Sequence, residues 1–270
     1  MEFLNKCIKF LSSALCLPCP TKLQMAVLAG MVGTSVSLYL LRIYMNGGRC
    51  MNTNRLDGKT VVITGSNSGI GKVTAIELAS RGARVILACR NMEKGLAALK
   101  EIKEKSGSEN VILMQLDLAS KHSIEEFAHI FLAQEEHLHV LINNAGGFSY
   151  KKEKTEDGFE ITMGVNYMGH FYLTKLLLDQ PKKSAPSRII NVSSLAHKYC
   201  LKDFIDDLNM VNVEYTPFYA YANSKAANVM HAFELSRLLK DTGVTAYSLH
   251  PGSVAVETHK PKSTILRVSY

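Results

Sequence analysis

Hydrophobic positions after residue 59 follow two alternating patterns. Short runs rich in Val, Ile and Leu recur along the chain, and longer stretches with apolar residues at every third or fourth position separate them. The short runs predict strands at 60–63, 84–88, 111–115, 140–143, 189–192 and 246–249. The longer stretches predict helices, for example at 72–80, 123–134 and 222–239. Several short runs are apolar throughout, as in strands covered on both faces, so the pattern predicts an α/β fold with a Rossmann-like, doubly wound parallel sheet.

An uncharged apolar stretch precedes this region. Residues 23–41 contain no charged side chain and lie between Lys22 and Arg42. A helix of about 19 residues rises roughly 28 Å, which is close to the ~30 Å hydrocarbon core of a bilayer. We therefore expect an N-terminal transmembrane helix at about 23–41. The alternative is a cleaved signal peptide, whose apolar part is usually shorter and nearer the N-terminus.

The apolar stretch also divides the chain. Residues 1–55 are expected to form the membrane anchor and linker, with a hinge at 46–56, and residues 56–270 the globular domain. The orientation stays open, because basic side chains are divided nearly evenly between the two flanks. These flanking residues are Lys6, Lys9, Lys22, Arg42, Arg49, Arg55 and Lys59.

The composition fits one sizeable globular domain with an appendage, since the 270 residues are 47% hydrophobic and 20% charged. The net charge of +7 arises at the N-terminus, because residues 1–55 hold six Lys or Arg against one acidic residue. This distribution argues against a nucleic-acid partner and suits a membrane surface. Of the six cysteines only Cys89 and Cys200 fall in the globular part, so no disulfide framework is expected. The isolated Cys16–Leu–Pro–Cys19 spacing predicts no metal site.

A glycine-rich turn follows the first predicted strand and leads directly into a helix. Gly65 permits a tight turn, Gly69 lets the backbone approach a phosphate, and Gly71 allows close helix packing. The N-terminus of the helix offers N–H groups and a positive dipole end to a pyrophosphate. The sequence therefore predicts a dinucleotide site. Its candidate residues are Gly65, Ser66, Asn67, Ser68, Gly69, Ile70 and Gly71.

The end of the second strand indicates which dinucleotide. An acidic side chain there favours NAD by binding the ribose 2′-hydroxyl, but this chain has Ala88–Cys89–Arg90–Asn91. The Arg90 guanidinium can bind a 2′-phosphate in a bidentate fork, so we expect NADP(H). Lys72 is a second candidate contact for that phosphate. The alternative for Arg90 is a solvated arginine at a strand end.

Tyr221 and Lys225 lie four residues apart in a predicted helix, which places both on one face. A free phenol has a pKa of about 10, and a nearby ammonium and a cationic nicotinamide would stabilise its phenolate. Tyr221 can then act as general acid in carbonyl reduction or general base in alcohol oxidation. The alternative is a chance pairing, because Tyr and Lys occur at this spacing in many helices.

The order of these motifs resembles the short-chain dehydrogenase/reductase family. The glycine turn is followed by Leu116–Asp117–Leu118 and then by Asn143–Asn144–Ala145–Gly146, as in that family. The resemblance implies that Asp117 contacts the adenine. It also adds to the cofactor site Asn143, Ala145, Gly146, Tyr221, Lys225, Pro251 and Gly252.

The same resemblance implies two further catalytic side chains. Ser194, with Ser193 in support, would hydrogen-bond the reacting oxygen, and Asn166 would hold a water that links Lys225 to solvent. The catalytic set implied is Asn166, Ser194, Tyr221 and Lys225. Ser193 also fits an ordinary turn at a strand end, and Asn166 a helix asparagine that satisfies local backbone groups.

Longer strings at 88–90, 138–146, 184–188 and 191–197 resemble the microsomal retinol dehydrogenases. This implies an NADP(H)-dependent oxidoreductase that interconverts retinol and retinal, or similar lipophilic alcohols and aldehydes, by direct hydride transfer in the direction of reduction. It also implies an endoplasmic reticulum membrane, with the catalytic domain facing the cytosol. The only glycosylation sequon, Asn191–Val192–Ser193, falls in a predicted strand and gives a lumenal location no support. A homo-oligomer is left open.

Two departures from the family pattern leave alternatives. The interval between Ser194 and Tyr221 is long, and its acidic part at 202–217 is expected to form a loop beside the substrate mouth. Val256 stands where the family usually has Ser or Thr, with Thr258 as a substitute. The chain is also shorter than the family's usual length, which predicts that 245–249 forms a sheet edge. The alternatives are a truncated, inactive form and a steroid or lipid-aldehyde reductase.

Overall fold

The computed structural model describes residues 21–45, 51–252 and 254, and the chain divides into two compact units, Met1–Asn52 and Thr53–Tyr270. The first unit contains helix α2 (Lys22–Met45). Its Thr21–Gln24 start forms a capping box: the Gln24 amide donates to Thr21 Oγ1 (3.3 Å) and the Thr21 amide donates to Gln24 Oε1 (2.8 Å).

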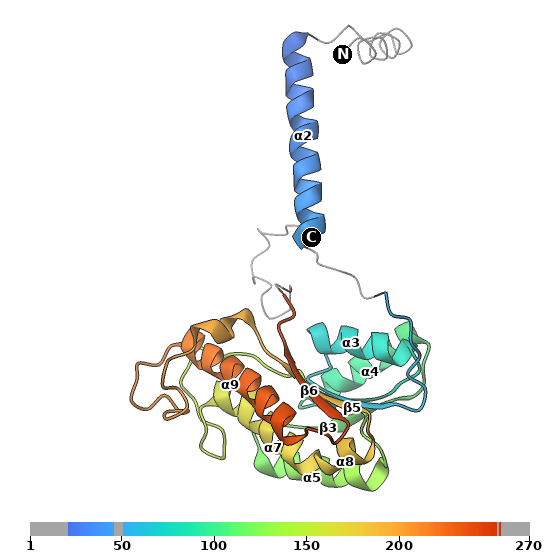
Figure 1. Cartoon of the computed structure of the whole chain (residues 1–270), viewed down its shortest axis with the longest axis vertical. Coiled ribbons are helices and arrows are strands. Elements are labelled where there is room, and N and C mark those ends of the chain that lie inside the picture. The colour runs from blue at the N-terminus through green and yellow to red at the C-terminus, as the bar shows by residue number, and fades with distance from the viewer. Residues whose placement is uncertain (1–20, 46–50, 253, 255–270) are drawn as a thin grey trace. The chain divides into compact units, whose positions relative to one another are not determined.

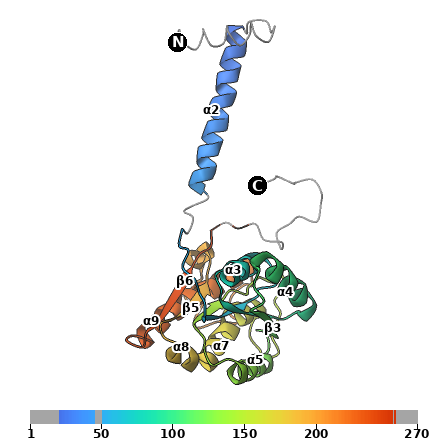
Figure 2. The ribbon, with the colours of Figure 1, turned by 90° about the vertical axis from the view of Figure 1, so that its right-hand side faces the viewer.

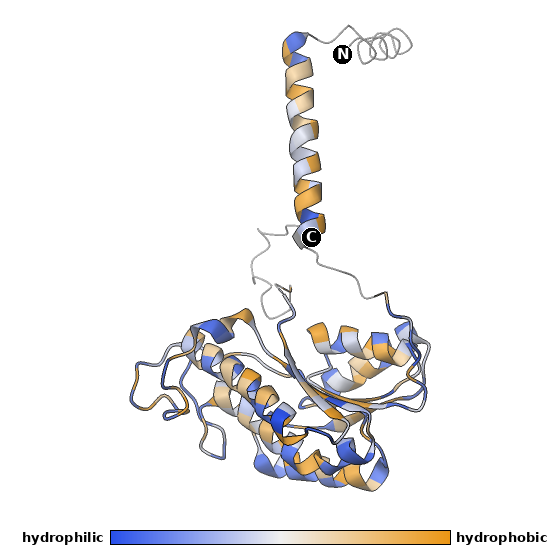
Figure 3. Cartoon of the chain, in the orientation of Figure 1, coloured by the Kyte–Doolittle hydropathy of each residue, from blue (hydrophilic) through white to orange (hydrophobic). Residues whose placement is uncertain are grey.

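The side of helix α2 that Figure 3 shows is apolar to neutral along its middle, with hydrophilic residues near its ends. Its span Lys22–Tyr44 reaches a mean hydropathy of 1.6 with none of that window buried, so by length and composition it is able to cross a membrane. The helix predicted at 23–41 is therefore present; it begins one residue earlier and ends four residues later than predicted.

The second unit is built on a six-stranded parallel sheet with strand order β3-β2-β1-β4-β5-β6. All six predicted strands are present, and two of them begin two residues earlier than predicted. The strands are β1 (Thr60–Thr64), β2 (Arg84–Cys89), β3 (Val111–Gln115), β4 (Val140–Asn143), β5 (Ser187–Val192) and β6 (Val244–Leu249).

Helices cover both faces of this sheet (Figures 1 and 2). One face carries α3 (Gly69–Ser80) and α4 (Met92–Ser106), and the other carries α5 (Lys121–Gln134), α7 (Gly169–Leu177) and α9 (Pro217–Leu238). The predicted doubly wound arrangement is confirmed. The short elements are α6 (Ile161–Met163), the π-helix η1 (Gly164–Met168), α8 (Asp179–Lys183) and the 3₁₀ helix η2 (Leu195–Tyr199).

Alternate residues of the central strands feed two hydrophobic cores. In β1 the fully buried Val61 and Ile63 join the core under α3 and α4, whereas Val62 joins the core with Phe127 and Phe131 of α5. Because side chains in a strand point to opposite faces in turn, an apolar β1 can bury both faces at once.

Helix starts are fixed by local sequence. The Asn91 side chain accepts from the Lys94 amide (2.8 Å) at the start of α4, and the Ser120 side chain accepts from the Ser123 amide at the start of α5. Thr216 caps α9 in the same way, with Pro217 at its first position. These caps satisfy N–H groups that a helix leaves unpaired at its N-terminus.

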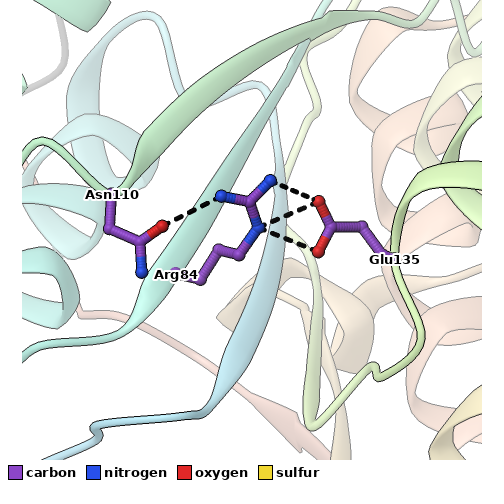
Figure 4. Close-up of polar contacts among 3 residues, drawn as sticks. All are labelled: Arg84, Asn110 and Glu135. Atoms are coloured by element: carbon purple, nitrogen blue, oxygen red, sulfur yellow. Dashed lines mark hydrogen bonds and ion pairs between the residues drawn. The ribbon is translucent and has the colours of Figure 1, made fainter.

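An ion pair joins the start of β2 to the C-terminal end of α5 (Figure 4). Arg84, the first residue of β2, donates from Nη2 to Glu135 Oε1 (2.6 Å) and from Nε to Glu135 Oε2 (2.8 Å), and its Nη1 donates to Asn110 Oδ1 (2.9 Å). The bond to Glu135 raises the pKa of the Arg84 guanidinium. Arg84, Asn110 and Glu135 therefore lie at the N-terminal ends of the strands, opposite to the loops that bear the candidate site.

The strand order creates a crevice at the C-terminal ends of the strands. After β3 the chain crosses back to place β4 beside β1, so the loops after β1 and β4 turn away to opposite faces. Ligands of open α/β sheets bind at such a switch point, outside the C-terminal ends of the strands.

Candidate functional site

A cleft of about 600 Å³ opens at this switch point. The glycine turn after β1, the ends of β2 and β3, the turn after β4 and η1 contribute to its lining. Eleven of the residues predicted from sequence line it: Gly65, Asn67, Ser68, Gly69, Ile70, Gly71, Arg90, Asp117, Ala145, Gly146 and Asn166.

Other predicted cofactor residues lie outside this lining. Ser66 and Asn143 are buried beneath it: the Ser66 hydroxyl donates to the Ile63 carbonyl (3.0 Å), and Asn143 Nδ2 donates to Thr174 Oγ1 (3.0 Å). These two buried side chains support the residues that line the cleft. Pro251 and Gly252 follow β6 and do not contribute to the lining, and Val256 and Thr258 lie outside the described residues.

Two glycines of the turn are required by packing. A Cβ on Gly65 would lie 2.8 Å from Ala145 Cα, and one on Gly71 would lie 2.6 Å from Asn144 Nδ2. Gly65 also has a φ of 65°, in the left-handed region that favours glycine. The turn after β1 can therefore rest directly against the turn after β4, and the floor of the cleft is closed.

The N-terminus of α3 suits an anionic ligand. Its N-cap residue Ser68 makes no side-chain capping bond, and the first-turn residues Gly69, Ile70 and Gly71 line the cleft. N–H groups left uncapped at a helix start bind phosphates well. The residues present thus fit the pyrophosphate of a dinucleotide.

The adenosine end of the cleft contains a cation that sequence reasoning missed. Lys94, in the first turn of α4, lines the cleft together with Arg90. A lysine is unfavourable beside the positive end of a helix dipole, and that misfit was the available signal. Lys72, which was predicted to assist Arg90, instead forms an ion pair with Glu101 (2.8 Å) and lies outside the lining.

Helix α9 carries the predicted Tyr and Lys on one side. Lys225 Nζ lies 5.5 Å from the centroid of the Tyr221 ring and donates to the Val192 carbonyl (2.9 Å). The lysine is 4% exposed, and burial lowers its pKa to about 8. A Cβ on Gly146 would lie 3.2 Å from this Nζ, so the ammonium lies directly against a residue that lines the cleft.

The predicted catalytic residues Tyr221, Lys225 and Ser194 do not contribute to the lining of the cleft, but Tyr221 adjoins it. Its ring makes an edge contact with the ring of Phe148, a lining residue, at a centroid distance of 6.1 Å. Ser194 lies two residues after the end of β5 and caps η2, where its Oγ accepts from the Ala196 amide (3.2 Å). The neighbouring Ser193 donates from Oγ to the Lys225 carbonyl (2.8 Å), which ties the end of β5 to α9.

Asn166 lies in the π-helix η1 and not in regular α-helix. Its Oδ1 accepts from the Gly147 amide (3.0 Å), and its Nδ2 donates to the Gly147 carbonyl (2.8 Å) and to Ser224 Oγ (3.0 Å). Ser224 in turn donates to the Tyr221 carbonyl (2.7 Å). Asn166 therefore connects the turn after β4 with the helix that carries Tyr221, and π-turns of this kind are frequent at functional sites.

The irregular segment between β5 and α9 lies at the rim. Tyr215 donates from its hydroxyl to the carbonyl of Ser149, a lining residue (3.0 Å), as expected for a loop beside the mouth. Tyr150, which is 80% exposed, makes an edge contact with the ring of Phe148, a lining residue, at a centroid distance of 5.2 Å. Aromatic side chains beside a cleft suit an apolar substrate.

Comparison with known proteins agrees with this geometry. The model of the family described as short chain dehydrogenase matches residues 59–205. Retinol dehydrogenase 11 from Homo sapiens is 52% identical over 221 residues, which are 80% of this chain and 68% of that protein. Among solved structures, an uncharacterized protein from Mycobacterium Paratuberculosis is 41% identical with a TM-score of 0.65, covering 74% of this chain and 70% of that one. The Pseudomonas aeruginosa RhlG/NADP active-site complex is 25% identical with a TM-score of 0.62, covering 76% of each chain.

Proposed function

The chain belongs to the short-chain dehydrogenase family and is an oxidoreductase, and from that premise we propose that it interconverts retinol and retinal, or similar lipophilic alcohols and aldehydes, with NADP(H). The reaction is a direct hydride transfer that runs towards reduction. The observation that carries the proposal is the position of Lys225 against Gly146, a residue that lines the cleft, and one helical turn from Tyr221. The 52% identity to retinol dehydrogenase 11 supports a retinoid substrate.

Each proposed catalytic residue has a distinct role. The bound nicotinamide supplies the hydride. Tyr221 gives its phenolic proton to the carbonyl oxygen, and Ser194 donates a hydrogen bond to the same oxygen. Lys225, charged below its pKa of about 8, favours the phenolate that remains. Asn166 holds a water through which the proton is replaced from solvent.

The cofactor is proposed to be NADP(H) because the cleft near β2 is cationic. Arg90 and Lys94 line it there, and no carboxylate occupies 88–91 to repel a 2′-phosphate. An arginine fork matches phosphate geometry, and a lysine adds a point charge. The similar RhlG structure contains NADP.

The preference for NADP(H) predicts an asymmetric effect of Arg90→Ala. Charge-assisted hydrogen bonds contribute about 1.5–3 kcal/mol, so the Kd for NADPH should rise about 10- to 100-fold. The Kd for NADH should change less than about threefold, because NADH lacks the phosphate. Cofactor fluorescence titration measures both constants. Arg188→Ala, at the exposed start of β5, is the matched control, and an equal loss for the two cofactors would contradict the proposal.

We further propose that residues 1–55 form a membrane anchor and linker and that 56–270 form the catalytic domain. The apolar, unburied α2 supports the anchor. The proposed location is the endoplasmic reticulum with the domain in the cytosol. Retinoids partition into lipid, so an anchored domain works where its substrate is concentrated. In the described part of the domain, the one sequon asparagine, Asn191, is 1% exposed in β5 and offers no glycan acceptor.

A substrate panel tests the proposed function. The full 270-residue chain in detergent, supplied with NADPH, should reduce retinal with a kcat/KM at least about tenfold above that for a short-chain aldehyde or a steroid ketone. NADPH oxidation and retinol formation are measured together. Higher activity on the steroid would favour a steroid reductase, and NADPH binding without turnover of any carbonyl would favour an inactive protein.

A further inference from the structure

One buried histidine connects the end of β1, just before the glycine turn, with Asn166 on the proposed proton path. His170, in the first turn of α7, is 1% exposed. Its Nε2 lies 2.8 Å from Thr64 Oγ1, at the end of β1, and its Nδ1 lies 3.0 Å from the Asn166 carbonyl oxygen. The three residues come from different elements of the fold, and the imidazole bridges them.

The donors and acceptors around Thr64 determine the tautomer of the ring. Thr64 Oγ1 accepts from the amides of Asn144 and Ala145, both at 2.9 Å. With its acceptor sites occupied, the hydroxyl hydrogen is left for His170 Nε2, because the Ile142 carbonyl is farther away at 3.4 Å. Nε2 is therefore the acceptor, and Nδ1 carries the hydrogen that goes to Asn166.

The Asn166 carbonyl, which takes a side-chain donor, lies within the widened turn of η1. The amide of Gly169 bonds to the Gly164 carbonyl, five residues back, and this spacing shifts the ordinary helical ladder. The His170 ring satisfies the Asn166 carbonyl from within the protein. The side chain of the same asparagine holds Gly147 and Ser224.

We propose that His170 is a positioning residue. Through Thr64 it holds the turn after β4, which lines the cofactor cleft, and through its Nδ1–H it holds the backbone of Asn166. The cleft and the proposed proton path are thereby kept in a fixed position relative to each other. The inference rests on the proposed function for its kinetic part. Burial, with smaller contributions from Lys225 and His231, lowers the pKa of His170 to about 3 against the opposing effect of the bond to Asn166, so the imidazole is neutral near pH 7 as the bonding requires. If His170 had a purely structural role, its replacement would lower the stability of the fold, and different substitutions would not affect the NADPH Kd and kcat separately.

Two substitutions of His170 each keep one of its two hydrogen bonds and remove the other. His170→Gln places an amide oxygen near the Nε2 position and keeps an acceptor for Thr64, whereas His170→Asn places an amide N–H near Nδ1 and keeps a donor for Asn166. For His170→Gln we expect kcat to fall about tenfold with the NADPH Kd within about threefold. For His170→Asn we expect the NADPH Kd to rise about tenfold, with kcat at saturating NADPH lowered by less than about threefold.

His139→Gln is the matched control. His139 is 8% exposed, and its Nδ1 accepts from the amide of Thr60 (3.0 Å), at the opposite end of the same β1 strand. Its replacement should lower the Tm without moving the NADPH Kd or kcat. Steady-state kinetics with retinal, fluorescence titration with NADPH and thermal unfolding are measured on each full-length variant.

The outcomes decide between the roles. A lower kcat alone in His170→Gln, together with a raised NADPH Kd alone in His170→Asn, supports the positioning role. The same changes in both variants, or a lower Tm alone as in His139→Gln, overturn it. If the wild-type chain binds NADPH but reduces no carbonyl, the proposed function fails, and the Kd contrast between the two variants still tests His170. A wild-type chain that does not bind NADPH rejects both proposals.

Discussion

Replacing Tyr221 with Phe is expected to lower turnover about 10²- to 10⁴-fold while leaving the NADPH Kd within about threefold of wild type. The substitution removes only the hydroxyl, so the edge contact of the ring with Phe148 and the approach of Lys225 Nζ to the ring remain. The missing group is the proposed proton donor to the carbonyl oxygen. Single-turnover reduction of retinal and fluorescence titration with NADPH measure the two quantities.

Tyr219→Phe provides the comparison for that experiment. Tyr219 lies on the same helix two residues earlier, is 38% exposed and packs against Phe218. Its hydroxyl has no role in the proposed reaction, so this variant should retain wild-type turnover. Substantial activity in Tyr221→Phe, with Tyr219→Phe unchanged, would remove Tyr221 from the mechanism.

Acidification from about pH 7.5 to about pH 5 should lower the free energy of unfolding by on the order of 4 kcal/mol. Burial lowers the pKa of His170 to about 3 and that of His231 to about 4, from 6.5. Below pH 6.5 the unfolded chain takes up these two protons and the folded chain does not. Their contribution to stability is complete above pH 6.5 and is lost as the pH falls towards 4 and then 3, at about 1.4 kcal/mol per unit for each group.

Urea unfolding of the full chain in detergent at several pH values measures this slope. His231→Asn keeps a polar group near Nδ1, where the Asn191 side chain lies 3.3 Å away, and removes one titrating group, so the slope should be roughly halved. His122→Gln is the control, because this side chain is 78% exposed and its loss should leave the slope unchanged. A stability that is flat between pH 7.5 and pH 5 would show that the buried imidazoles do not resist protonation.

Strand positions were predictable from sequence because the central strands are apolar on both faces. The predicted starts of β5 and β6 were two residues late, and the reason is tertiary. Ser187 pairs with Val244 and Arg188 with Thr245, so polar residues that resemble a loop in sequence complete a ladder between two strands. The start of α9 was also late. Thr216 and Pro217 give a sequence signal for that start, and the 222–239 prediction passed over it.

The site was predictable where its chemistry is local. The glycine turn and the Tyr221–Lys225 pair lie within single segments, so spacing alone brings their residues together. Lys72 was expected at the cofactor but pairs with Glu101 on the next helix, and no local pattern reveals that choice. His170 shares a hydrogen bond with Thr64, which lies 106 positions away, and only the folded chain brings the two together.

The pairing of β1 with β4 has a consequence for biosynthesis. Val61 lies opposite Val140, so the middle of the sheet joins segments that leave the ribosome far apart in time. Until β4 emerges, a nascent β3-β2-β1 sheet has an unpaired β1 edge, whose Val61, Val62 and Ile63 are fully buried in the finished fold. A bare apolar edge is a template for mispairing with another chain. Slower elongation through 65–139 would lengthen that interval, and a chaperone that shields apolar strands would be needed most while β4 is still being made.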